Sequence, residues 1–275
     1  MNNLVIICAI LLLVLLFLKV PVYIAVLSAS AVYFIGTPGM NLSIFAQKTI
    51  SGAEGLSLLA IPFFVCAGIF MNYTGVTKRI MNCCEVLTAR MPGGLAQVNI
   101  LLSTLMGGLS GSSLADAAMQ CKMLVPTMES KGYSKSFSTV ITAASGMVVP
   151  LIPPGVGLII YGCINNISIG KLFIAGIGPG IVLCVTLMIF THFLSKKRGY
   201  LPSRTTKIPV SEKIAAVRPA FLPLLLPIII IGGVRIGVFT ASEAGTVAIV
   251  YAVLLGLLYN CLLYTSPSPR DRQKS

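Results

Sequence analysis

Long apolar runs separated by short polar gaps recur from Leu4 to Asn260. Several of these runs approach the ~20 residues that a helix needs to cross the hydrocarbon core of a bilayer. The pattern therefore predicts an all-α polytopic membrane protein, a helical bundle of about six to eight passes and hairpins, rather than a soluble domain.

The first two runs are Leu4–Leu18 and Val22–Gly36, and each is short for a full span. Lys19 and Pro21 separate them, which predicts a helical hairpin or two tilted helices. No basic residue precedes the first run and no small-residue cleavage site follows it. We therefore expect a retained helix rather than a signal peptide.

The next apolar run is Leu56–Tyr73, and Pro62 within it predicts a kink. The stretch Thr77–Arg90 is polar and amphipathic, so it is expected to lie along the membrane surface. Together these two stretches predict one crossing followed by one surface helix.

Basic residues flank the segment Gly94–Val125 at both ends, and the positive-inside rule places both flanks on the cytoplasmic side. A segment that begins and ends on one side of a membrane must turn back within it. The Gly/Ser-rich sequence GGLSGSSLADA, Gly107–Ala117, is where we expect a re-entrant helical hairpin to turn. The basic residues concerned are Lys78, Arg79, Arg90, Lys122, Lys131 and Lys135.

A second interruption lies in AASGMVVPLIPPGVG, Ala143–Gly157. Its prolines supply no amide hydrogen, and each disfavours helical backbone dihedral angles at the residue before it. These effects predict a broken transmembrane helix with unpaired carbonyls. Irregular backbone at membrane depth is tolerated where it is buried in protein or lines a cavity. Two such interruptions near each other are typical of an ion-coupled transporter site, and their carbonyl and hydroxyl oxygens suit Na⁺. A GxxxG packing face at Gly107 and Gly111 is the alternative for the first.

The remaining chain predicts two crossings in Phe137–Leu194, which turn outside near Asn165–Gly170, a basic cytoplasmic loop and two further helices. The predicted divisions are 1–55, an N-terminal membrane hairpin; 56–90, a transmembrane helix and a surface helix; 91–194, a transport region; 195–218, a basic cytoplasmic loop; 219–260, two transmembrane helices; and 261–275, a tail foreign to the fold.

Composition supports this interpretation: 56% of the residues are hydrophobic and 10% are charged. The net charge of +13 does not indicate nucleic acid, because the basic residues lie in the gaps between apolar runs, where they orient a membrane protein. An intramembrane hydrolase is disfavoured, since the sequence holds one histidine and neither HExxH nor GxSxG. The eight cysteines show no metal-ligand spacing.

Two acidic residues lie close to predicted helix starts. Asp116 is either a coupling or substrate-binding carboxylate within the membrane or a stabilising charge near the start of the second hairpin helix. Glu243 follows Thr240 in the sequence TASE, which predicts a helix capping box.

The chain also resembles the large membrane subunit of tripartite ATP-independent periplasmic (TRAP) transporters, the DctM type. The matching blocks, in family order, are LLAIPFFVCAG (58–68), GLSGSSLADAA (108–118), VPTMESKGY (125–133), IPPG (152–155), YGCINNISIGKLFIAGIGPG (161–180) and GVFTASEAGTVAIVYA (237–252). Members of that family consist of two inverted repeats. The resemblance covers the first of them.

The resemblance implies a Na⁺-driven, elevator-type permease of the bacterial inner membrane. It would take up a small organic anion, such as a C4-dicarboxylate, sialic acid or another carboxylate, from a periplasmic binding protein and work beside a small four-helix membrane subunit. It further implies a sodium site at Ser110, Gly111, Ser112, Gly146, Pro150 and Pro153, and substrate contacts from Ser112 and Ser113. Asp116 is a further candidate for substrate binding, because of its charge within the membrane. A carrier that works without a binding protein and a structural fragment without transport are the alternatives.

Overall fold

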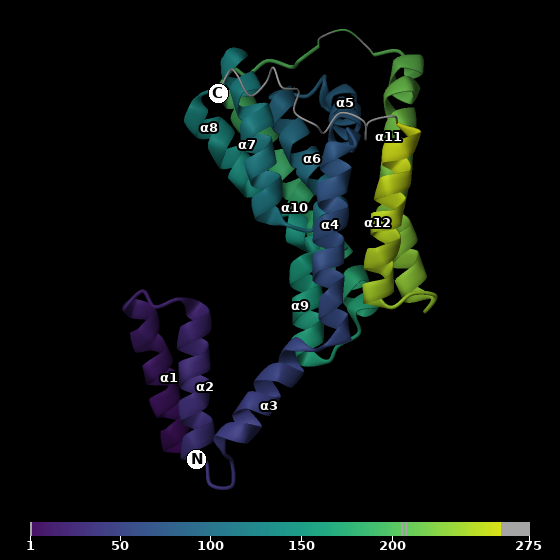
Figure 1. Cartoon of the computed structure of the whole chain (residues 1–275). Coiled ribbons are helices and arrows are strands. Elements are labelled where there is room, and N and C mark those ends of the chain that lie inside the picture. The colour runs from purple at the N-terminus through teal and green to yellow at the C-terminus, as the bar shows by residue number, and fades with distance from the viewer. Residues whose placement is uncertain (1, 205, 207, 260–275) are drawn as a thin grey trace, which may run out of the picture. The chain divides into compact units, whose positions relative to one another are not determined.

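The computed structural model describes residues 2–204, 206 and 208–259. In that part of the chain every regular element is helical, which confirms the predicted all-α class (Figure 1). The chain divides into two compact units, one ending at Gly55 and the other beginning at Leu56. Residues 261–275, expected to be foreign to the fold, lie outside the described residues.

The first unit holds α1 (Asn2–Phe17), α2 (Val22–Gly36) and α3 (Leu42–Ala53). The helices α1 and α2 form a hairpin, because a Cβ added to Gly36 at the end of α2 would lie 2.7 Å from Leu4 at the start of α1. Most apolar side chains of both helices are exposed, as expected of helices in lipid. Asn41 begins α3, and its side chain accepts a hydrogen bond from the amide of Ile44.

The second unit contains the remaining helices. They are η1 (Leu56–Leu59), α4 (Ala60–Tyr73), α5 (Val76–Thr88), α6 (Gly94–Ser110), α7 (Ser113–Ser130), α8 (Lys135–Ser145), η2 (Val149–Leu151), α9 (Val156–Asn165), α10 (Ile169–Lys197), α11 (Val210–Arg235) and α12 (Ala241–Leu258).

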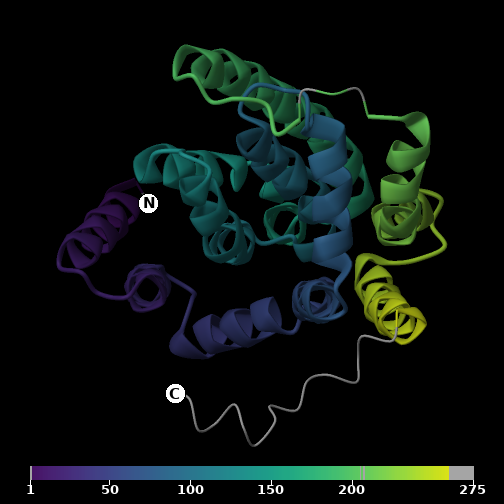
Figure 2. The same ribbon diagram turned by 90° about the horizontal axis from the view of Figure 1, so that it is seen from above.

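Helix α4 packs along α12, where a Cβ added to Gly245 would lie 2.7 Å from Cβ of Phe63. The prediction of a kink at Pro62 is wrong, since α4 begins at Ala60 and Pro62 therefore occupies its first turn, where a missing amide costs nothing. Helix α5 bends away from α4 by 71° and is seen lengthwise in Figure 2. Its apolar face is buried, in agreement with its amphipathic sequence.

Helix α11 begins at Val210, so residues 210–218, which the sequence predicted to be loop, are helical. Pro219 had suggested the start of the helix, yet it lies inside α11 together with Pro223 and Pro227. Pro223 leaves the carbonyl of Pro219 without its helical donor. The Tyr259 hydroxyl fills that place and donates to the Pro219 carbonyl over 3.1 Å.

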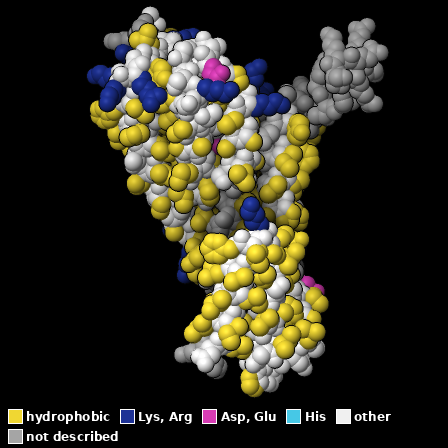
Figure 3. Space-filling model, turned by 90° about the vertical axis from the view of Figure 1, so that its left-hand side faces the viewer, with side chains coloured by type: hydrophobic (Ala, Val, Ile, Leu, Met, Phe, Trp, Pro, Cys, Tyr) yellow, Lys and Arg dark blue, Asp and Glu magenta, His cyan; other side chains and the backbone are white. Residues whose placement is uncertain are grey.

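Three helices in the described residues are long and apolar enough to cross a membrane, α10, α11 and α12, and two bent pairs pass the same test. The bent pairs are α4 with α5, and α8 through η2 with α9, which bend by 71° and 42°. Lys and Arg side chains gather at the upper end of the second unit in Figure 3. Length, composition and this charge asymmetry agree with a multi-pass membrane protein.

Candidate ion and substrate site

A tight turn joins α6 to α7 at the predicted place. Gly111 ends α6 with φ of 60°, a left-handed conformation that glycine adopts without steric cost. Ser112 then caps α7, because its hydroxyl accepts a hydrogen bond from the amide of Ala115 over 3.4 Å. The Gly/Ser sequence thus forms the tip of a helical hairpin.

The crossing that follows is broken where its prolines predicted. Helix α8 ends at Ser145, the short helix η2 follows, and α9 begins at Val156. Because proline has no amide hydrogen, the prolines of this stretch remove the helical donors for three carbonyls. These carbonyls belong to Gly146, Val149 and Pro150.

The hairpin tip and the break lie against each other. The amide of Val156 donates a hydrogen bond to the Gly111 carbonyl over 3.3 Å. A Cβ added to Gly111 would lie 2.6 Å from the Pro154 carbonyl oxygen, and one added to Gly107 would lie 3.1 Å from Cα of Val149. The two glycines therefore also serve as a packing face, and that face is directed at the broken crossing.

Helix ends of both polarities converge at this contact. The amino-terminal end of α7 meets the carboxyl-terminal end of α8, since a Cβ added to Gly146 would lie 3.5 Å from the carbonyl of Ser113. The amino-terminal end of α9 meets the end of α6 through Val156 and Gly111. Helix amino termini attract negative charge and carboxyl termini attract cations, so the arrangement can accept an anion and a cation side by side.

The structure brings most of the predicted site residues together here. Gly111 is buried, while Ser112 and Ser113 are partly exposed at the tip. Pro150 and Pro153 belong to the break, and the carbonyl of Pro153 would lie 3.1 Å from a Cβ added to Gly108. Ser110 ends α6, but its side chain lies outside the described residues.

Asp116 lies apart from the tip surface, because only 2% of it is exposed. Ser103 and Gln120 each donate a hydrogen bond of 2.7 Å to its Oδ2 atom. The Oδ1 atom of Asp116 and the Oε1 atom of Gln120 have no partner among the described residues. Ser112, rather than Asp116, caps the helix. The cluster thus holds a buried carboxylate, one of whose oxygens has no hydrogen-bond partner among the described residues.

Ser103 and Gln120 were not predicted from the sequence. Asp116 and Gln120 are four residues apart, a spacing that places two side chains on one helical face. That spacing could have indicated Gln120, whereas no local pattern indicates Ser103, which comes from α6. No group of three or more His, Cys, Asp or Glu side chains that could hold a metal ion occurs in the part of the chain that the structure describes. Carbonyl, hydroxyl and single carboxylate oxygens suit an alkali cation better than a transition metal.

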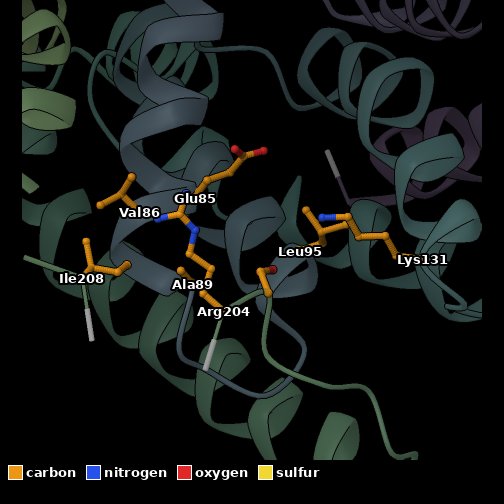
Figure 4. A pocket seen from close by; sticks show the side chains of 8 residues that line it. Glu85, Val86, Ala89, Leu95, Lys131, Arg204 and Ile208 are labelled. Atoms are coloured by element: carbon orange, nitrogen blue, oxygen red, sulfur yellow. The ribbon is translucent and has the colours of Figure 1, made fainter. Parts of the chain in front are cut away.

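A separate cavity of about 180 Å³ shares no residue with the hairpin tip (Figure 4). The side chains of Lys131 and Arg204 both line it, and Arg204 is paired with Glu212. Its lining residues are Glu85, Val86, Ala89, Leu95, Lys131, Ser203, Arg204 and Ile208.

Comparison with known proteins shows which family the chain is similar to. A family model described as the DctM component of tripartite ATP-independent periplasmic transporters matches residues 9–268. The sialic acid TRAP transporter large permease protein of Vibrio cholerae is 41% identical over 249 residues, which cover 90% of this chain and 58% of that protein. The 2,3-diketo-L-gulonate TRAP transporter large permease protein of Escherichia coli is 40% identical over 235 residues, which cover 86% and 55%. The ectoine TRAP transporter large permease protein of Halomonas elongata is 37% identical over 243 residues, which cover 88% and 56%.

The chain thus spans little more than half the length of these relatives. The relatives are named as permeases, which agrees with the expectation of a permease subunit rather than an intramembrane hydrolase. The family match extends over nearly all of the described residues, including the hairpin tip and the broken crossing. The chain belongs to the DctM family, the large permease component of TRAP transporters.

Proposed function

We propose that the chain is the part of a Na⁺-coupled permease that carries one ion site and part of the substrate cavity. The solute is a small organic anion of the carboxylate class, delivered by a periplasmic binding protein. A small membrane subunit completes the assembly in the bacterial inner membrane. The named solutes of the relatives, such as sialic acid and 2,3-diketo-L-gulonate, are carboxylates and support this class.

The observation that carries the proposal is the contact between the hairpin tip and the broken crossing. Carbonyls that lack helical donors lie beside the amino-terminal ends of two helices. In a membrane interior such carbonyls need a partner, and a Na⁺ ion supplies one. The amino-terminal ends of α7 and α9 favour a carboxylate.

The residues then take distinct roles. Ser112 and the carbonyls around Gly146 and the prolines bind Na⁺, while Ser112 and Ser113 face the anion. Asp116 is buried, and its Oδ1 atom has no hydrogen-bond partner among the described residues, so its ionised form is favoured when a cation is bound close by. It lowers the free energy of a nearby cation rather than contacting the solute. Each bound ion in turn favours the other, since coupling between two sites is reciprocal.

Sodium-specific stabilisation of the purified chain tests the ion site. A ligand present at 100 times its dissociation constant stabilises the folded state by about 2.7 kcal/mol. We expect the chain in detergent to unfold at a higher temperature in NaCl than in KCl or choline chloride of equal ionic strength. Equal unfolding temperatures in the three salts would refute the ion site.

Two serine variants provide a matched comparison. Ser112 and Ser134 each begin a helix and each accept a hydrogen bond of 3.4 Å from a backbone amide. Ser112→Ala and Ser134→Ala should therefore lose similar capping stability, about 1 kcal/mol. The Ser134 hydroxyl also accepts from the Tyr200 hydroxyl over 3.4 Å, so the control loses one more hydrogen bond than the test variant. Only Ser112→Ala should lose Na⁺ stabilisation, and it should also lose Na⁺-dependent uptake in proteoliposomes that contain the binding protein and the small subunit. Equal Na⁺ responses of the two variants would remove Ser112 from the site.

A further inference from the structure

Helix α6 runs beside the broken crossing, and the contacting residues keep a nearly constant separation along the chain. Asn99 contacts residues that lie 43 and 46 positions further along the chain. Gly107 and Gly111 meet Val149 and Pro154 at nearly the same offset. The contact therefore extends along about 18 Å of α6, at 1.5 Å per residue. At Gly107 and Gly111 the contact consists of close backbone packing. At Asn99 it consists of side-chain hydrogen bonds.

Those hydrogen bonds converge on Asn99, which is fully buried. Its Nδ2 atom donates to Oγ1 of Thr142 over 2.7 Å, and its Oδ1 atom accepts from the Ser145 hydroxyl over 2.7 Å. Both partners lie in the last turn of α8, directly before the break at Gly146. Asn99 thus ties the end of α8 to the hairpin.

The orientation of the Asn99 amide follows from the network. Thr142 gives its hydroxyl hydrogen to the Ser138 carbonyl, so its oxygen is free to accept. The Asn99 group that faces Thr142 must therefore be the amino group. The amide oxygen then faces the Ser145 hydroxyl, which also lies 2.9 Å from the Thr142 carbonyl. Both polar atoms of the Asn99 side chain are thus satisfied, unlike those of the Asp116 cluster.

We infer that Asn99 is a positioning residue for the sodium site, which it serves by fixing the axial register between α6 and the broken crossing. This inference rests on the proposed function. Asn99 does not itself contact the ion in this arrangement. Its two hydrogen bonds set where α8 ends, and the end of α8 sets where the carbonyls around Gly146 lie relative to the hairpin tip.

The variant Asn99→Ala removes both hydrogen bonds, but it also leaves Thr142 and Ser145 buried with fewer partners. That change lowers stability whatever the role of Asn99. The triple variant Asn99→Leu/Thr142→Val/Ser145→Ala separates the two effects. Replacing all partners by apolar groups of similar shape is close to neutral for stability. The replacement does not restore the hydrogen bonds that fix the register between α6 and α8.

The expected result is a weaker affinity for Na⁺ in both variants. Partners outside the ligand shell of a metal typically contribute about 10–100-fold to its affinity. We expect the Na⁺ concentration for half-maximal stabilisation to rise at least about tenfold in Asn99→Ala and in the triple variant. The control Thr191→Val removes a buried hydroxyl that has no partner among the described residues, and it should leave that concentration unchanged.

The outcomes separate this inference from the proposed function. If the parent chain binds Na⁺ and the triple variant binds it with parental affinity, the inference is overturned and the proposed function stands. If Thr191→Val weakens Na⁺ binding as much as the triple variant, the effect belongs to packing in general and the inference is overturned as well. If the parent chain shows no Na⁺-specific stabilisation, the proposed function and the inference fail together.

Discussion

Gly111 offers the most direct test of how closely the hairpin tip meets the broken crossing. Its φ of 60° is left-handed, and a residue with a side chain loses about 1–2 kcal/mol in that conformation. A methyl group there would also lie 2.6 Å from the Pro154 carbonyl oxygen, and overpacking costs a further ~1–3 kcal/mol. Gly111→Ala should therefore lower the free energy of unfolding by about 2–5 kcal/mol.

Gly132 is a matched control within the same chain. It has φ of 86°, and no heavy atom of the described residues lies within 4 Å of a Cβ added to it. Gly132→Ala should therefore lose only the conformational component, about 1–2 kcal/mol. The difference between the two variants isolates the contact with Pro154.

Equilibrium unfolding of both variants in the same mixed detergent micelles measures that difference. Repeating the measurement in NaCl and in KCl separates packing from ion binding, because Gly111→Ala should also reduce the Na⁺-specific stabilisation. If the two variants lose the same free energy of unfolding, the tip does not approach the Pro154 carbonyl, and the site built on that contact is wrong.

Two further substitutions test features outside the site. Tyr259→Phe should lower the free energy of unfolding by about 1 kcal/mol, because it removes the donor to the Pro219 carbonyl. The loss should shrink in a Pro223→Ala background, where a restored amide serves that carbonyl, and a double-mutant cycle without coupling would contradict this pairing. Thr240→Ala should cost about 0.5–2 kcal/mol, because Thr240 and Glu243 form a capping box at the start of α12. Equilibrium unfolding in detergent measures the loss, and an unchanged stability would show that the box contributes nothing.

The sequence predicts the features that depend on backbone chemistry. Glycine at the hairpin tip and proline at the break act locally, so both interruptions can be placed from the residues of a short segment. The capping box at Thr240 was predicted for the same reason and is confirmed. The predictions of a kink at Pro62 and of a helix start at Pro219 were wrong. A proline in the first turn of a helix and a proline within a helix cannot be distinguished when the start of the helix is unknown.

The polar clusters between helices could not be predicted. Asn99 and Ser103 are polar residues within a mainly apolar helix, and their partners come from α8 and α7. Which faces meet depends on the rotation and axial offset of whole helices, which no short segment encodes. Asp116 was recognised as unusual because of its charge, while its burial against Ser103 became evident only from the packing.

The shared register of α6 and the broken crossing has a consequence for motion. Sliding one element past the other by a single residue would displace it by about 1.5 Å. Such a step would break the Asn99 hydrogen bonds and would replace Gly111 by a serine opposite the Pro154 carbonyl, where there is no room for a side chain. Closely packed surfaces of this kind do not slide past each other in small steps. If the hairpin moves across the membrane, the broken crossing beside it must therefore move with it as one rigid body.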